Sequence, residues 1–168
     1  MGERKFLNAL EVALRNEMKE REFYLKNAER TKNPLGRAMF QQIADEEVEH
    51  FERLKELHEK WKSEGKWPAT IPLEVRHTVV RNILSDLIER IDKMVQTDED
   101  ELQAIRTAID FEAKGVSHYR KLRDEATDPK VKQFFDLLAS IEHEHYLSLK
   151  ETEEYLTDPA SWFLKTRL

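Results

Sequence analysis

The chain contains one chemical pattern twice: a glutamate, followed thirty residues later by a Glu-x-x-His step. The six residues of this repeated pattern are Glu17, Glu47, His50, Glu112, Glu142 and His145. A glutamate and a histidine three positions apart share one face of a helix, and carboxylates and imidazoles are common metal ligands. The pattern therefore predicts a two-metal site in the core of a four-helix bundle.

A proline stands at the same place in each set. Pro34 and Pro129 each follow an Asn or Asp residue, which marks a turn and the start of a helix. The first glutamate lies 17 residues before its proline, and the Glu-x-x-His residues lie 13 and 16 residues after it. At about 1.5 Å per residue, the three side chains of each hairpin lie at nearly the same height above the turn. Two hairpins related by a pseudo-twofold axis then bring all six side chains into one layer.

The rest of the sequence indicates a duplication. Residues 8–60 aligned with residues 103–155 give 16 identities in 53 positions, and these include turn and core positions. We therefore predict an all-α, ferritin-like four-helix bundle made of two duplicated antiparallel helical hairpins. The connection between the hairpins is far longer than a tight turn needs, so it can carry the chain back along the bundle in one long crossover.

We expect a single domain over residues 1–168. Its parts are hairpin 1 at about 3–64, the crossover at about 65–97, hairpin 2 at about 98–156 and a docked tail at 157–168. Within the crossover, an amphipathic segment at about 75–95 predicts an extra helix. Its apolar stripe consists of Val79, Ile83, Leu87, Ile91 and Met94.

Capping signals mark the end of the crossover. Thr97 or Asp98 can cap the next helix, with Glu101 as the capping-box partner. In the tail, we expect the aromatic residues Trp162 and Phe163 to dock on the bundle.

Composition argues against several other kinds of protein. Charged residues make up 37% of the chain and hydrophobic ones 39%, with only 4 glycines and 5 prolines, which suits long amphipathic helices. The net charge of −6 and the lack of a basic cluster argue against a nucleic-acid or membrane partner. No apolar run reaches the roughly 20 residues that span a bilayer. We expect a soluble, cytoplasmic protein, and the absence of cysteine excludes thiolate chemistry.

The charge of the predicted site also indicates metal. Four buried carboxylates without cations would repel one another and lose their hydration at high cost. Two divalent ions offset four negative charges, and two neutral imidazoles complete the ligand set. Carboxylate-rich ligation favours iron or manganese, although the affinity order of divalent metals leaves zinc open. Tyr24 and Tyr119, each seven residues after a glutamate of the pattern, can hydrogen-bond the carboxylates or simply pack in the core.

With these residues placed, the chain resembles the rubrerythrin branch of the ferritin-like diiron-carboxylate proteins. The resemblance covers about residues 5–62 and 98–156 and includes the stretches Asp45-Glu46-Glu47-Val48-Glu49-His50 and Ile141-Glu142-His143-Glu144-His145. It implies that the repeated pattern ligates two iron ions, with manganese or a mixed pair as alternatives. Glu47 and Glu142 then bridge or chelate the metals, and each histidine caps one metal. The resemblance further implies an oxidoreductase active in oxidative stress, which reduces peroxide or oxidises Fe(II) with peroxide or dioxygen.

The chain departs from this family in three ways. Rubrerythrins append a cysteine-rich iron domain, so electrons for this cysteine-free chain must come from an external donor such as rubredoxin. Gly115 replaces an extra carboxylate of the family, and the pseudosymmetric position holds Glu20, which is either a seventh ligand or a solvated side chain. Val48 stands where bacterioferritins have a haem-ligating methionine, so we expect no haem. Because classical ferritins also lack the second Glu-x-x-His, we expect a small oligomer rather than a cage, and the apolar stripe of the crossover helix favours a homodimer.

Two other functions stay open at this point. The chain can be an iron-binding or storage module without significant turnover, or a metal-free helical interaction domain. Metal content and the reaction of the reduced protein with peroxide distinguish these possibilities.

Overall fold

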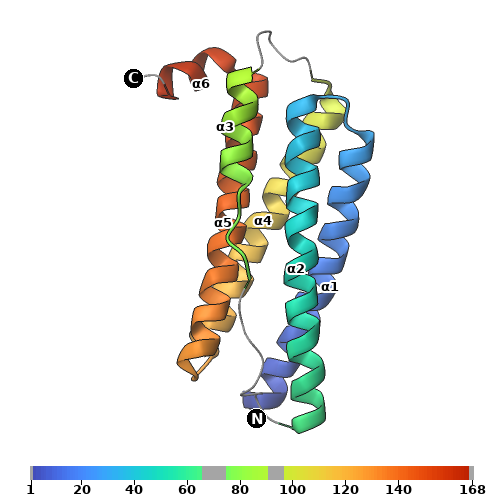
Figure 1. Cartoon of the computed structure of the whole chain (residues 1–168), viewed down its shortest axis with the longest axis vertical. Coiled ribbons are helices and arrows are strands. Elements are labelled where there is room, and N and C mark those ends of the chain that lie inside the picture. Colours follow the sequence, from blue (N-terminus) through green and yellow to red (C-terminus); the bar gives the residue numbers. More distant parts are fainter. Residues whose placement is uncertain (1, 66–74, 91–96, 167–168) are drawn as a thin grey trace.

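The computed structural model of the chain describes residues 2–65, 75–90 and 97–166. This part of the chain forms six helices and contains no strand, so the predicted all-α class is confirmed. The helices are α1 (Gly2–Arg30), α2 (Pro34–Glu64), α3 (Val80–Arg90), α4 (Glu99–Glu125), α5 (Pro129–Thr157) and α6 (Pro159–Thr166). The four long helices α1, α2, α4 and α5 form the bundle (Figure 1).

The bundle consists of two antiparallel hairpins whose turns lie at opposite ends (Figure 1). Helix α1 packs along α2, and α4 packs along α5; the hairpins meet where α1 contacts α4 and α2 contacts α5. Helix α2 ends at one end of the bundle and α4 begins at the other, so the crossover traverses its length. The predicted pair of hairpins, with one long crossover that contains an extra helix, is confirmed.

The same local chemistry fixes both hairpin turns. Asn33 Oδ1 accepts hydrogen bonds from the backbone N–H groups of Leu35 (2.9 Å) and Gly36 (3.1 Å). Asp128 Oδ1 accepts one from the N–H of Lys130 (2.8 Å). A proline occupies the first turn of both helices, where an N–H has no helical partner in any case. Both second helices therefore start at corresponding positions, which sets the height of every later side chain.

The crossover helix begins later than the sequence predicts. Residues 75–79 form no helix, and the predicted apolar stripe is wrong at its start. Val79 is 46% exposed, whereas Val80 and Leu84 are buried, and α3 packs against both α2 and α5. Ile91 and Met94 lie outside the described residues.

Two carboxylates on α2 explain why residues 75–79 are not helical. The backbone N–H of Arg76 donates to Glu49 (2.5 Å), and the N–H of Val79 donates to Glu46 (3.2 Å). The Arg76 guanidinium also pairs with Glu49 (2.7 Å). These bonds hold the segment against α2 until α3 begins.

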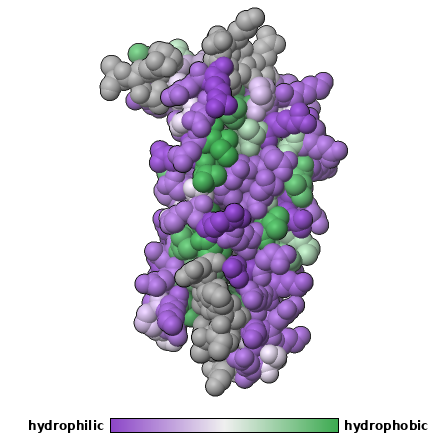
Figure 2. All heavy atoms as spheres, viewed as in Figure 1, coloured by the Kyte–Doolittle hydropathy of each residue, from purple (hydrophilic) through white to green (hydrophobic). Residues whose placement is uncertain are grey.

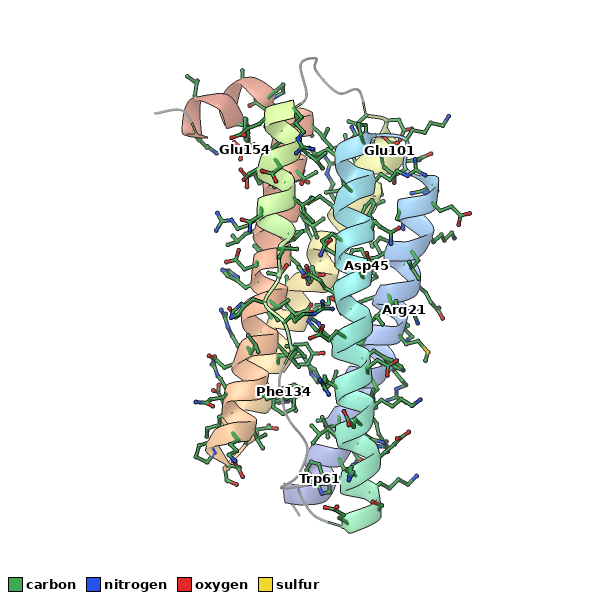
Figure 3. The ribbon with its side chains drawn as sticks, in the orientation of Figure 1. Arg21, Asp45, Trp61, Glu101, Phe134 and Glu154 are labelled. Atoms are coloured by element: carbon green, nitrogen blue, oxygen red, sulfur yellow. The ribbon has the colours of Figure 1, made fainter. Side chains whose placement is uncertain are left out.

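Two apolar clusters fill the bundle, one toward each end. The first includes Leu10, Leu54, Trp61, Phe134 and Phe135. The second includes Leu35, Phe40, Ile43, Leu84 and Leu149. Figure 3 shows Trp61 and Phe134 toward the end at which the N-terminus lies. The two clusters leave a layer of polar side chains between them.

The tail forms a short helix on α5. Trp162 is buried, packs edge-to-face on Tyr155 with ring centroids 5.0 Å apart, and donates from Nε1 to Glu151 (3.1 Å). The side chain of Phe163 lies outside the described residues.

The face of the molecule in Figure 2 is mostly hydrophilic. On the face shown in Figure 2, hydrophobic residues form small patches, including a strip over α3. Within the described part of the chain, no helix combines the length and the apolar character that crossing a membrane requires.

Glu101, at the start of α4, joins the two hairpins at one end of the bundle (Figure 3). Its Oε1 accepts from the backbone N–H groups of Lys32 (2.7 Å) and Asn33 (3.2 Å) in the α1–α2 turn. Its Oε2 accepts from Thr97 Oγ1 (3.0 Å), and the predicted capping box with Asp98 is present. A single carboxylate thus helps to cap α4 and accepts hydrogen bonds from the α1–α2 turn.

We predict that Glu101→Ala lowers the free energy of unfolding by about 3 kcal/mol, because it removes a cap partner and leaves buried N–H groups without an acceptor. Asp98→Ala is the matched control and should cost about 1 kcal/mol, since it removes only the cap. Chemical denaturation of the metal-free variants measures both values. Equal losses would show that the contacts of Glu101 with the α1–α2 turn add nothing.

Candidate metal centre

The six residues of the repeated pattern lie together between the two apolar clusters. Glu17 comes from α1, Glu47 and His50 from α2, Glu112 from α4, and Glu142 and His145 from α5. Each residue is at most 1% exposed. All four long helices therefore contribute to one buried polar layer.

The ligand atoms of these residues form two overlapping sets, and within each set they lie within 4.8 Å of one another. One set is Glu17, Glu47, His50 and Glu142, and the other is Glu47, Glu112, Glu142 and His145. We call these the His50 half and the His145 half. Glu47 and Glu142 belong to both halves, which is the composition of a dinuclear site with bridging carboxylates.

Each histidine directs Nδ1 toward the carboxylates. In the His50 half, Nδ1 lies 3.6 Å from Glu47 and 3.7 Å from Glu142. In the His145 half, Nδ1 lies 3.6 Å from Glu47 and 3.5 Å from Glu112. The two rings are nearly parallel, with centroids 6.4 Å apart. One imidazole nitrogen is thus available to a metal in each half.

Two tyrosines connect the hairpins across the site. The Tyr24 hydroxyl on α1 donates to Oε1 of Glu112 on α4 (2.6 Å), and the Tyr119 hydroxyl on α4 donates to Oε1 of Glu17 on α1. Burial, together with the nearby carboxylates, raises the pKa of both tyrosines well above 10.0, so both hydroxyls stay protonated. Each ring also packs in an apolar cluster, so the two roles that the sequence leaves open occur together.

Many buried polar atoms of the site have no hydrogen-bond partner. Among the described residues, 12 buried side-chain nitrogen or oxygen atoms have none, and 8 of them belong to the six residues of the pattern. They include both carboxylate oxygens of Glu47 and Glu142 and the Nδ1 atoms of both histidines. Because each unpaired buried group costs about 1–3 kcal/mol, their concentration indicates a cation-binding site. Four carboxylates and two imidazoles suit two iron or manganese ions.

Without metal, the shared carboxylates differ in charge. Burial alone would raise the pKa of Glu47, but His145 and His50 hold it at about 2. Burial, followed by the charges of Glu112 and Glu47, raises the pKa of Glu142 well above 4.5. Burial would lower the pKa of His145, yet Glu112 and its neighbours raise it well above 6.5. Protons therefore occupy the metal-free site, and metal binding must release them.

Glu46 also belongs to the site, although the repeated pattern does not include it. Nε2 of His145 donates to Oε1 of Glu46 (2.7 Å), and Glu46 Oε2 accepts from the N–H of Val79 in the crossover. Glu46 directly precedes Glu47, but neighbouring residues on a helix point in different directions, so adjacency alone does not identify Glu46. A search for repeated residues passes over it because the corresponding residue of the second hairpin is Ile141.

Glu20 and Gly115 also break the repeat at the site. Glu20 is only 8% exposed, and burial, followed by the charge of Glu112, raises its pKa well above 4.5. It is therefore not a solvated side chain, and it belongs to neither set of ligand atoms found among the described residues. A seventh-ligand role for Glu20 stays a prediction. At Gly115, a Cβ atom would lie 2.7 Å from Oε2 of Glu142, so the glycine leaves room for that shared carboxylate.

Comparison with known proteins agrees with this fold. The rubrerythrin family model matches residues 8–153 of the chain. Among solved structures, a hypothetical protein from Pyrococcus furiosus, Pfu-1136390-001, is 24% identical, with a TM-score of 0.66 over 90% of this chain and 89% of that chain. That similarity concerns the fold alone. No curated protein matches the sequence significantly.

The charge state of the site predicts a pH dependence of the metal-free protein. Glu142, Glu20 and His145 have pKa values above their usual ones, so the folded state holds protons that the unfolded state has lost. The stability from these groups is lost as pH rises through their folded-state pKa values. We predict that the melting temperature of the metal-free protein falls as the pH rises above 6.5, the ordinary pKa of histidine, and that metal binding, which strengthens with pH, removes this decline. Thermal melts with and without metal test this; a flat or rising metal-free curve would contradict it.

The sharing of Glu142 predicts that one substitution affects both metals. Glu142→Gln should lose most of both ions, because it removes a carboxylate that belongs to both halves. Glu144→Gln is the matched control, since Glu144 lies on the same helix, is partly exposed and pairs with Arg81 (3.6 Å). Metal analysis after reconstitution gives the ion count per chain. Two ions retained in Glu142→Gln would refute the ligand assignment.

Proposed function

Because the chain belongs to the rubrerythrin family, we propose that its buried site binds two iron ions and reduces hydrogen peroxide to water. The observation that supports this proposal is that Glu47 and Glu142 belong to both sets of ligand atoms. Carboxylates shared in this way hold two metals close together. Two bound iron ions supply the two electrons that, with two protons, convert one peroxide into two waters.

The chain's own residues keep the carboxylates in place for this role. Tyr119 and Tyr24 bind Oε1 of Glu17 and Glu112, respectively. Oε2 of each of these glutamates is buried and has no hydrogen-bond partner. Each tyrosine thus fixes the rotation of a carboxylate and leaves the second oxygen for a metal. Each tyrosine hydroxyl donates to a glutamate of the opposite hairpin. The same two hydrogen bonds therefore orient the carboxylates and connect the hairpins.

A hollow beside the site offers a route for a small substrate. It has a volume of about 280 Å³, lies between α1 and α4, and is lined by Glu17, Glu20 and Gly115 among others. A water molecule occupies about 30 Å³ in the liquid, so the hollow admits molecules of the size of peroxide or dioxygen. The apolar clusters close the bundle above and below the site. We propose this side of the bundle as the substrate entrance.

Turnover by this site needs a separate source of electrons. The chain has no cysteine and so cannot itself hold a cysteine-ligated iron. We propose an external electron donor such as rubredoxin, a homodimeric assembly, and a cytoplasmic role in oxidative stress without a nucleic-acid or membrane partner. Manganese or a mixed metal pair is a further possibility for the same ligands.

Reaction with peroxide tests the proposed activity. The Fe(II)-loaded protein should be reoxidised by peroxide at least about tenfold faster than by air, a difference of about 1.4 kcal/mol in the barrier. Stopped-flow absorbance in the near-ultraviolet follows the oxidation, and Glu144→Gln should behave as the unaltered chain does.

The other outcomes assign the alternatives. Equal or faster reoxidation by air, with Fe(II) oxidised beyond two ions per chain, would favour Fe(II) oxidation over peroxide reduction. Iron that binds but neither reacts with peroxide nor accepts electrons from reduced rubredoxin would favour an iron-binding or storage module. A protein that binds no iron would refute the proposed function.

A further inference from the structure

The two halves of the site are alike in their ligands and unlike in what surrounds those ligands. The ligands follow the 95-residue repeat, so each half has one glutamate and one histidine of its own. The neighbouring residues do not follow it. Glu46 and Glu20 in hairpin 1 correspond to Ile141 and Gly115 in hairpin 2.

Glu46 holds the ring of only one histidine. Nε2 of His145 donates to Glu46 at 2.7 Å, while Nδ1 of the same ring is directed toward the metal ligands. Glu46 is in turn held by Gln42 Nε2 (2.7 Å) and by the backbone N–H of Val79 (3.2 Å). A carboxylate bound to the far nitrogen of a ligating histidine fixes its tautomer and orientation and raises its basicity.

His50 has no such partner. Its Nδ1 is directed toward Glu47 and Glu142, and no residue in the described part of the chain hydrogen-bonds its Nε2. The residue that corresponds to Glu46 in the repeat, Ile141, is apolar and fully buried. His50 instead lines a second hollow, of about 270 Å³, together with His77 and Arg76. Its ring is therefore less constrained than that of His145.

The second break in the repeat is Glu20. Glu20 is buried and lines the first hollow together with Glu17 and Gly115. Its counterpart Gly115 brings no charge to the site. Hairpin 1 thus brings two carboxylates that the repeat does not supply in hairpin 2, and of these Glu46 hydrogen-bonds a histidine of the pattern.

From this asymmetry we propose that the two halves bind metal unequally and in order, with the His145 half taking the first divalent cation and the His50 half the second. Glu46 is the positioning residue that sets this order. The inference rests on the proposed function only in requiring that two ions bind. The weakly held, exchangeable ion then belongs to the His50 half, whose histidine borders the second hollow.

Titration of the metal-free chain with Co²⁺ tests the order. Calorimetry and the visible cobalt absorption should show two steps, the first tighter than the second. Glu46→Gln should weaken the first step by roughly 10–100-fold, the usual effect of losing such a partner, and leave the second nearly unchanged. His145→Ala should abolish the tight step, whereas His50→Ala should retain it.

Glu49→Gln is the matched control for Glu46→Gln. Glu49 also lies on α2 and binds the crossover through Arg76, but it hydrogen-bonds neither histidine. If Glu46 served only to hold residues 75–79, both variants would lose stability and neither would change the first binding step. Should Glu46→Gln fail to fold, Gln42→Ala provides a second variant, because Gln42 Nε2 donates to Glu46 (2.7 Å), and it should weaken the same first step.

The possible results separate the proposal from the function on which it rests. Two Co²⁺ ions bound with equal affinity, or a tight step that survives both Glu46→Gln and His145→Ala, would overturn the order and leave the two-ion site standing. If Glu46→Gln weakened only the second binding step, the His50 half would bind the first cation, and the proposed order would be wrong. Fewer than two ions per unaltered chain would instead overturn the two-ion site itself.

Discussion

Four carboxylates buried at the centre of an apolar helical bundle are the constraint on which the rest of this structure depends. Each of them is at most 1% exposed. In the metal-free chain, protonated His145 and protons bound by the carboxylates balance this charge only in part, and eight atoms of the site stay without partners. The fold must hold these groups together against their repulsion, and bound cations would supply the missing stabilisation.

The bundle meets this requirement by packing apolar side chains on both sides of one polar layer and by linking the hairpins within the layer. The clusters around Phe135 and Phe40 bury the helices above and below the site. Inside the layer, Tyr24 and Tyr119 connect α1 with α4 in both directions. Because the same hydroxyls orient Glu112 and Glu17, the bonds that hold the hairpins together also prepare the ligands.

The fold and the six central residues could be predicted from the sequence because they depend on spacing. A proline-initiated helix rises by a constant amount per residue, so the distances from Pro34 and Pro129 determine which side chains lie level. The start of α3 could not be predicted in this way, because residues 75–79 are held out of the helix by bonds to Glu46 and Glu49 on a distant element.

Glu46 illustrates a second limit on prediction. In the sequence it is one of several acidic residues on a charged helix, and nothing in its spacing distinguishes it from Asp45 or Glu49. Its contact with His145 depends on how α2 packs against α5, which is a tertiary property. The internal repeat, which identifies the ligands so well, hides this residue because it is not repeated.

The loss of symmetry around the site follows from the topology. Two hairpins that enter from opposite ends need one crossover, and a single crossover cannot lie on both sides of a pseudo-twofold axis. Here residues 75–79 lie against α2, so Glu46 finds a backbone N–H donor there in addition to His145. The corresponding Ile141 is fully buried in an apolar cluster, where an unpaired carboxylate would be costly. A duplicated hairpin can therefore keep identical ligands in its two halves, but the connection between the halves makes their surroundings differ.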